Sequence, residues 1–350
     1  MRLRRPSMAL IVFKYIRIPM LALSDIFNQQ KRPWRILTIF LSALIYSSYS
    51  TAQSDYPNRP VKIVVPFGAG GMSDGLTRLF AKELSNKLGQ PFVLDFKPGA
   101  ATNIGAAAVF NSPSDGYTLF VSTMASNALN KWTYKKLAFD PDAFSNVGIM
   151  GVVTSFVVVR PESPFKSVED LIRAAKANPQ GLSYGTHGAG GPNHMITELF
   201  RSQSGIQQLV HVPYKGPESH VDLMAGRIDF MIDGAAINLV QSGKLRAIAV
   251  TYPRRWPTQP NIPTMAEQGY PQVTLSAFFG LCAPPNTPAS ILEKLNAVMR
   301  DVARNPDIEK ALLSTNIMPM AATRQETTDF IKQQSEKWGP ILKSLNISFD

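Results

Sequence analysis

Apolar runs of strand length alternate with segments of helical periodicity from residue 61 onward. In the first half of the chain, strands are expected at 61–67, 92–96, 117–122, 147–153 and 156–159. An amphipathic pattern that stops at Gly89 and the alanine-rich segment Asn103–Phe110 predict helices between the first three of these strands. Strands that alternate with helices predict a mostly parallel sheet with right-handed crossovers.

The same alternation restarts after Pro164. Ser167 is placed to cap a helix that ends at Ala177, and a second helix is expected at 193–204. Further strands are expected at 182–185, 209–214, 230–233, 245–251 and 274–283, and two helices at 289–304 and 324–344 close the chain. We therefore expect two α/β domains, the first formed by 53–155 plus 280–350 and the second by 156–279. A tail that packs back on the first domain makes the backbone cross twice, which creates a hinge around a ligand cleft.

Two glycine-rich turns each follow an apolar run and precede a helical pattern. The turn at 68–74 reads Gly-Ala-Gly-Gly-Met-Ser-Asp, and the turn at 185–191 reads Gly-Thr-His-Gly-Ala-Gly-Gly. The first N–H groups of a helix lack intrahelical partners and carry partial positive charge, so they attract anions. One such turn in each half predicts a cleft that binds a small anion from both sides.

Composition and charge narrow the class of protein. The 350 residues are 45% hydrophobic and 17% charged, which is typical of a soluble globular chain. Most of the net charge of +11 lies in residues 1–52, where eight Lys and Arg face a single Asp. The rest of the chain has no basic stripe interleaved with aromatic residues, so we expect no nucleic-acid partner.

The basic front has the order of a secretory signal. Lys31, Arg32 and Arg35 precede the apolar run 36–45, and small polar residues follow as far as Ala52. This order predicts a signal peptide cleaved after Ala52, with Met20 or Met8 as the initiator. The run is too short for a comfortable membrane span, and an uncleaved anchor is the alternative. We therefore expect residues 1–52 to be a removed leader and the mature protein to be exported.

Cysteine and histidine usage gives no sign of a metal or cofactor. Cys282 is the only cysteine, so an internal disulfide and a cysteine metal cluster are excluded. The four histidines are His187, His194, His211 and His220. His187 and His194 could both point into a cleft, but we see no carboxylate at ligand spacing from these two. His194 either contacts the ligand or supports its turn. We predict no metal site and no cofactor.

One short motif points to catalysis but lacks its context. Residues 71–75 fit the G-x-S-x-G pattern of serine hydrolases, and 187–191 resemble the oxyanion segment of the same enzymes. The oxyanion segment should precede the nucleophile in the chain, whereas here it follows Ser73. Ser73 is better placed as a helix N-cap, with Asp74 in the favourable first turn. We expect no enzyme activity; a secreted hydrolase that uses Ser73 is the rival hypothesis.

An ordered set of short motifs resembles the Bug/TctC family of tripartite tricarboxylate transporter substrate-binding proteins. They are Tyr-Pro-Asn-Arg-Pro at 56–60 with the run to Gly71, Asp-Gly-Tyr-Thr-Leu at 115–119, His-Val-Pro-Tyr-Lys-Gly at 211–216, Gly-Lys-Leu-Arg-Ala at 243–247 and Pro-Pro-Asn-Thr-Pro at 284–288. The resemblance runs from about Tyr56 to the C-terminus. It implies a periplasmic binding protein of the type II-like α/β fold. Such a receptor, which we expect to be a monomer, closes on a small carboxylate and presents it to membrane permease subunits; a receptor for a membrane sensor kinase is the alternative.

The resemblance also implies a pocket built from loops at the strand ends. The ligand-binding residues expected from it are Phe67, Gly68, Ala69, Gly70, Gly71, Ser73, Asp74, Ser122, Thr123, Asn127, Thr186, His187, His194, Tyr214, Gly216 and Asp233. These loops are poor in arginine, so a carboxylate would be held by backbone N–H groups, hydroxyls and water. Three departures from the family pattern, at His187, at 234–236 and at Phe278, bear on pocket shape. Asp233 could pair with a ligand amino or hydroxyl group, cap a helix, or repel a second carboxylate.

Overall fold

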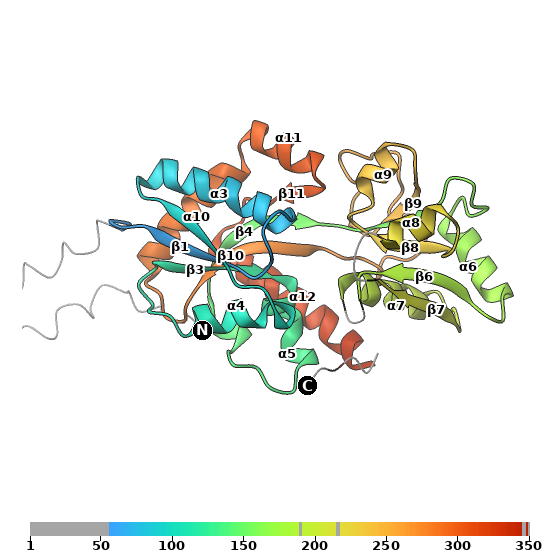
Figure 1. Cartoon of the computed structure of the whole chain (residues 1–350), viewed down its shortest axis with the longest axis horizontal. Helices are drawn as coiled ribbons and strands as arrows, with labels where there is room; N and C mark the ends of the chain where they lie inside the picture. The colour runs from blue at the N-terminus through green and yellow to red at the C-terminus, as the bar shows by residue number, and fades with distance from the viewer. Residues whose placement is uncertain (1–55, 189–190, 215–217, 345–347, 349–350) are drawn as a thin grey trace, which may run out of the picture. The chain divides into compact units, whose positions relative to one another are not determined.

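The computed structural model describes residues 56–188, 191–214, 218–344 and 348, whose strands form two sheets (Figure 1). The predicted leader lies outside these residues. The first sheet has the order β11-β4-β10-β3-β1-β2. Its strands are β1 (Val61–Val65), β2 (Phe92–Phe96), β3 (Thr118–Thr123), β4 (Ser145–Val153), β10 (Ala277–Ala283) and β11 (Ile317–Pro319). The second sheet has the order β7-β6-β8-β5-β9. Its strands are β5 (Phe156–Val159), β6 (Leu182–Thr186), β7 (Leu209–Pro213), β8 (Phe230–Asp233) and β9 (Arg246–Val250).

Both sheets are mixed rather than mostly parallel throughout. Strand β1 pairs in parallel with β2 and β3, and β6 pairs in parallel with β7 and β8. Strand β10 runs antiparallel between β3 and β4, and β5 runs antiparallel between β8 and β9. Strand β11 is a further exception, since it runs antiparallel to β4. Strand β5 follows β4 of the other sheet almost at once, without the crossover helix that a parallel neighbour requires.

Helices pack around both sheets, and Figure 1 shows α6 to α9 grouped around the second sheet. The helices and short helical turns of the first sheet are α3 (Met72–Leu88), η1 (Ala100–Thr102), α4 (Asn103–Phe110), η2 (Ala125–Leu129), α5 (Asn130–Thr133), η3 (Pro141–Ala143), α10 (Ala289–Ala303), α11 (Pro306–Ser314) and α12 (Arg324–Ser344). Those of the second are α6 (Val168–Ala177), α7 (Pro192–Gln203), α8 (Glu218–Met224) and α9 (Ile237–Gln241). The predicted Ser167 cap is confirmed. Ser167 Oγ accepts from the Asp170 N–H, and the Asp170 side chain accepts from the Ser167 N–H, which completes a capping box. The sequence pattern missed α11 and β11.

The two crossings between the sheets are joined by buried hydroxyl and amide groups. The first crossing is Thr154–Ser155, and Thr251 begins the second. Thr251 Oγ1 donates to the Ser155 carbonyl over 2.9 Å and lies 3.2 Å from Thr154 Oγ1. Asn316 has a left-handed backbone (φ 63°), and its side-chain amide donates to the carbonyls of Thr154 and Gly234 over 3.2 and 3.0 Å. The hinge therefore lies directly against the end of β8.

A lysine on α12 is bound to the second crossing and makes stability depend on pH. Lys337 Nζ donates to the Thr274 carbonyl over 2.7 Å and to Thr274 Oγ1. Burial lowers the pKa of Lys337 to about 8, below the roughly 10.4 of a lysine in an unfolded chain. Between these values the unfolded chain binds a proton that the folded chain does not, so folding stability contributed by this site rises with pH.

We therefore expect wild-type protein to gain melting temperature relative to Lys337→Met between pH 8 and 10. Thermal unfolding followed by circular dichroism across this range measures the difference. Lys332→Met, which alters an exposed lysine of the same helix, is the control and should show no such trend. A difference between wild type and Lys337→Met that stays constant from pH 7 to 10 would contradict the assignment.

Candidate functional site

Three adjoining cavities are lined by residues from both sheets and their connections. The first, called here the cleft cavity, has a volume of about 550 Å³. It is lined by Phe67, which follows β1, by Thr123 of β3 and by His187, which follows β6. A smaller cavity of about 210 Å³ contains Asp233 and shares Pro192 and Phe279 with the cleft cavity. A third cavity of about 550 Å³ adjoins the smaller cavity, because the two have some lining residues in common. Of the predicted site residues, Phe67, Thr123 and His187 line the cleft cavity, Asp233 lines the smaller cavity, and Gly70 and Gly71 line the third.

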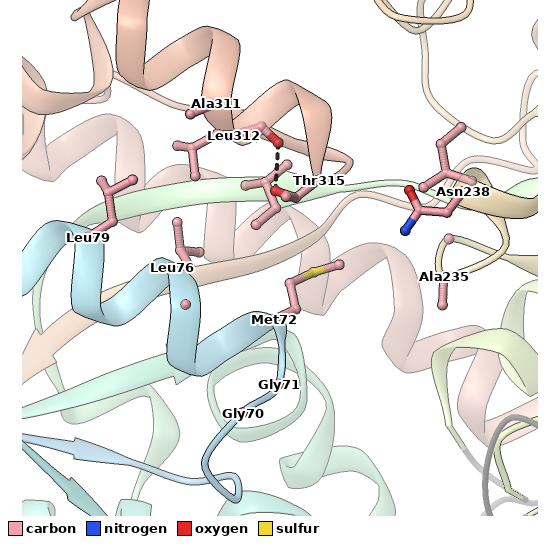
Figure 2. Close-up of a pocket in the computed structure, with 14 residues that line it drawn as sticks. Gly70, Gly71, Met72, Leu76, Leu79, Ala235, Asn238, Ala311, Leu312 and Thr315 are labelled. Carbon is pink, nitrogen blue, oxygen red and sulfur yellow. Dashed lines mark hydrogen bonds between the residues drawn. The ribbon is translucent and has the colours of Figure 1, made fainter. Parts of the chain in front are cut away.

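The third cavity is mainly apolar. Figure 2 shows Leu76 and Leu79 of α3 facing Leu312 of α11, with the backbone of the first glycine turn at one end. The hydroxyl of Thr315 is occupied, because it donates to the Leu312 carbonyl over 2.9 Å (Figure 2). Gly70 and Gly71 border this cavity rather than the cleft cavity. A carboxylate would meet few polar partners here, so we centre the candidate site on the cleft cavity.

The side chain of Asp74 stabilises the first glycine turn. The Gly70 N–H donates to Asp74 Oδ2 over 2.7 Å, and Asp74 Oδ1 lies 2.6 Å from Arg78 Nε. Asp74 therefore accepts from one residue of the turn and pairs with one residue farther along α3. The N-cap of α3 is Gly71, whose extended backbone starts the helix at Met72. The prediction that Ser73 is the N-cap is wrong, because the helix begins one residue before it.

The remaining residues of this turn differ in exposure. Ser73 is buried, and its hydroxyl has no hydrogen-bond partner in the described part of the chain. A serine nucleophile needs a base within hydrogen-bond reach, so this position does not support the hydrolase hypothesis. Phe67 is 36% exposed and meets Phe279 edge-on, with ring centroids 6.1 Å apart. Gly68 and Ala69 are exposed and border none of the three cavities.

Of the predicted residues Ser122, Thr123 and Asn127, only Thr123 borders the cleft cavity. Ser122 is buried beside Gly280 of the neighbouring strand, where a β-carbon on the glycine would come within 2.7 Å of its hydroxyl. Successive side chains on a strand point to opposite faces, which separates the two residues. Asn127 is buried, and its side chain accepts from Ser126 Oγ over 2.6 Å and lies 3.9 Å from Cys282 Sγ. Ser122 and Asn127 thus contact protein groups in the interior.

Three predicted residues of the second half, Thr186, His194 and Tyr214, contact other side chains of the protein. Thr186 Oγ1 lies 2.7 Å from His211 Nε2, and the His194 ring stacks on His211 with centroids 4.2 Å apart. Burial lowers the pKa of His194. The Tyr214 hydroxyl donates to Asp222 over 2.8 Å, and burial together with Asp222 raises the pKa of Tyr214 to about 12. Gly216 lies outside the described residues.

A group of ionisable side chains surrounds Asp233 at the end of β8. Its Oδ2 lies 2.6 Å from His220 Nε2 and 3.4 Å from His187 Nε2, while its Oδ1 accepts from Asn193 Nδ2 over 2.9 Å. The carboxylate is buried, and His187 is about one-third exposed. Burial alone would raise the pKa of Asp233, but hydrogen bonds and charge from His187 and His220 outweigh it and hold that pKa well below its ordinary range.

The structure adds a third turn that the sequence reasoning missed. Ala100, Ala101 and Thr102 have φ of 46°, 47° and 78°, a left-handed conformation that costs non-glycine residues free energy. Ala101 and Thr102 line the cleft cavity, where the Thr102 hydroxyl is buried without a hydrogen-bond partner among the described residues. Asn130 donates to the Ala101 carbonyl over 2.9 Å and supports the turn. The available signal was a run of small residues between a strand and a helix, as in the other two turns.

His220 is another residue that sequence reasoning did not assign to the site. It lies on α8, 33 residues from His187 and 13 from Asp233 along the chain, and no local pattern marks it as their neighbour. The expectation that no carboxylate lies near the histidines came from sequence spacing and is wrong in space. Asp233 contacts two of the four histidines.

Comparisons with known proteins agree with this architecture. The family model described as the tripartite tricarboxylate transporter family receptor (TctC) matches residues 76–347. A protein from the tcbD–tcbE intergenic region of Pseudomonas sp. strain P51 is 32% identical over 324 residues, covering 91% of this chain and 95% of its own length. The structure of Rpa4515 with adipate from R. palustris is 33% identical with a TM-score of 0.73, covering 84% of this chain and 99% of its own. The structure of MatC from Rhodopseudomonas palustris with bound malate is 26% identical with a TM-score of 0.69, covering 82% of this chain and 100% of its own.

Within the described residues, no helix combines the length and the apolar character needed to cross a membrane.

Proposed function

Because this chain belongs to the TctC family of tripartite tricarboxylate transporter receptors, we propose that it is a periplasmic solute-binding protein for a small carboxylate. It captures the carboxylate in the cleft cavity and delivers it to the membrane permease subunits of a tripartite transporter. The family consists of solute-binding receptors, which carry out no chemical turnover. We further propose that residues 1–52 are the export signal, that the two sheets correspond to two hinged domains, and that the receptor is a monomer.

The observation that carries the proposal is the make-up of the cleft cavity. Among the described residues, its polar lining consists mainly of Thr102, Thr123, Asn130, Thr133 and Tyr134, with His187 as its ionisable imidazole and no Lys or Arg. Hydroxyl donors hold a carboxylate without burying a fixed opposing charge, so release is not opposed by a strong ion pair. Reversible binding is what a delivery protein requires.

The lining also favours a ligand with an apolar middle. Phe67, Phe278, Phe279, Met124 and Met195 surround the polar groups. Two related receptors are described with adipate and with malate, which are both dicarboxylates. Burying methylene groups contributes about 0.8 kcal/mol each, so a chain longer than that of malate gains affinity against these rings. We therefore propose that this receptor prefers adipate-like dicarboxylates to malate.

Isothermal titration calorimetry of the purified mature chain with adipate, malate, acetate and citrate tests the function. We expect saturable one-to-one binding of a dicarboxylate and at least tenfold weaker binding in Thr123→Val, which keeps the side-chain volume but loses the hydroxyl. Ser122→Ala is the matched control, because its hydroxyl faces Gly280 and not the cavity. Absence of binding to every carboxylate would contradict the proposed function.

A further inference from the structure

We propose that His187, His220 and Asp233 form a binding site for a divalent transition-metal ion on the wall of the cleft. Each residue offers one ligand atom, and the three atoms lie within 4.8 Å of one another. Imidazole nitrogen and carboxylate oxygen are the ligands that Zn²⁺ and its neighbours in the first transition row take in proteins. Two imidazoles and one carboxylate form a ligand set of the kind found in metal sites with an open coordination position.

The distances suit such an ion with little movement. Ligand atoms about 2 Å from a tetrahedral zinc ion lie roughly 3.3 Å from each other. His187 Nε2 and Asp233 Oδ2 are already 3.4 Å apart, and the hydrogen bond of 2.6 Å between His220 Nε2 and Asp233 Oδ2 would lengthen as the ion replaces the shared proton. The two imidazole planes stand at 78° with centroids 5.6 Å apart, so the rings approach the carboxylate from different directions.

Independent parts of the fold bring the three ligands together. Asp233 is the last residue of β8, His187 follows the neighbouring parallel strand β6, and His220 comes from α8. Asn193 donates to Asp233 Oδ1 over 2.9 Å and to the Ile232 carbonyl over 2.8 Å. This pair of bonds orients the carboxylate with Oδ2 toward both histidines, which is the role of a group behind a metal ligand.

The position of the site gives the ion a use in binding the carboxylate, a part of the inference that rests on the proposed function. His187 lines the cleft cavity and Asp233 lines the cavity beside it. Three protein ligands leave at least one coordination position for a carboxylate oxygen of the solute. The ion would add positive charge to the lining, since none of the described residues around the cleft cavity is Lys or Arg.

The first test is titration of the mature protein with Co²⁺ and with Zn²⁺, after treatment with a chelator and in the absence of any carboxylate. We expect one equivalent of Co²⁺ to give visible d–d absorption that Zn²⁺ abolishes. His187→Gln and His220→Gln should each weaken binding at least tenfold, while His211→Gln, a histidine outside the cluster, should bind as the wild type does. His187 is about one-third exposed, so its variant tests the site without disturbing the core.

Three results would overturn the site: no stoichiometric Co²⁺ binding, equal binding by wild type and by the His187→Gln, His220→Gln double variant, or equal loss in His211→Gln. In the second test, adipate is titrated with and without one equivalent of Zn²⁺. We expect Zn²⁺ to raise the affinity of wild type about tenfold and to leave the double variant unchanged. Adipate binding that ignores Zn²⁺ would overturn the coupling. Metal binding without any carboxylate binding would instead contradict the proposed function and leave the metal site in place.

Discussion

Gly234→Ala is expected to lower the free energy of unfolding by about 3 kcal/mol, because overpacking against an immobile neighbour costs this much. A β-carbon on Gly234 would lie 2.3 Å from the Thr154 carbonyl oxygen and 3.2 Å from Asn316 Nδ2. The first contact is with backbone, which no change of rotamer can relieve. Thr154 belongs to the crossing between the sheets, so relief requires the end of β8 to move away from the hinge.

Gly75→Ala provides a matched control with the opposite sign. Gly75 lies inside α3, and a β-carbon there meets no atom within 4 Å. Alanine restricts the unfolded chain and favours the helix, so this variant should gain about 0.5–1 kcal/mol. Urea unfolding monitored by tryptophan fluorescence measures both variants. The interpretation fails when the two identical substitutions change stability by the same amount.

Gly234→Ala should also weaken ligand binding. Asp233 precedes it, and the Gly234 carbonyl is joined to Thr154 through the Asn316 amide. If the added methyl group displaces Gly234 from Thr154 and Asn316, the end of β8 changes its position against the hinge. We expect at least tenfold weaker adipate binding by calorimetry at a temperature where the variant is fully folded. Unchanged affinity in a destabilised but folded variant would separate the hinge from the binding site.

Asp233→Ala is expected to lower the free energy of unfolding by about 3–5 kcal/mol, the usual cost of removing one partner of a buried charged pair. The residue is 3% exposed. Its removal deprives His220 Nε2 of its acceptor and removes one of the two acceptors of Asn193 Nδ2. Asp233→Asn keeps the shape and one acceptor oxygen, so its loss should be smaller. Chemical denaturation in the presence of a chelator measures both variants without a contribution from bound metal.

Asp142→Ala is the control for Asp233→Ala. Asp142 also contacts a cation, Lys131 at 2.7 Å, but its side chain is 65% exposed. An exposed ion pair contributes less than about 1 kcal/mol because water and salt screen it. A stability loss in Asp233→Ala no larger than that in Asp142→Ala would show that the buried cluster does not stabilise the fold.

Local sequence determined the elements whose ends depend on neighbouring residues. Strand β2 and helix α4 begin and end where the pattern placed them, and Ser167 caps α6 through Asp170 three residues later. Gly89 ends α3 in a left-handed conformation (φ 74°), which glycine adopts at little cost. Each of these signals acts within a few residues. The ordered motifs likewise predicted the family, since they need no knowledge of contacts.

Tertiary structure decided which elements pair and which side chains meet. Strand β11 has three residues and gains its hydrogen bonds only from β4, far away in sequence, so no local periodicity marks it. The direction of β10 follows from its entry between β3 and β4.

The candidate site shows the same division. The sequence predicted the glycine turns as helix starts. The structure shows that the Gly70 N–H donates to Asp74 rather than pointing into the cleft. His187, His220 and Asp233 meet because two parallel strands and a separate helix converge. Their sequence separations carry no information about that convergence. Local conformation is encoded by interactions between near neighbours, whereas a site of this kind exists only after long-range packing has brought distant segments into contact.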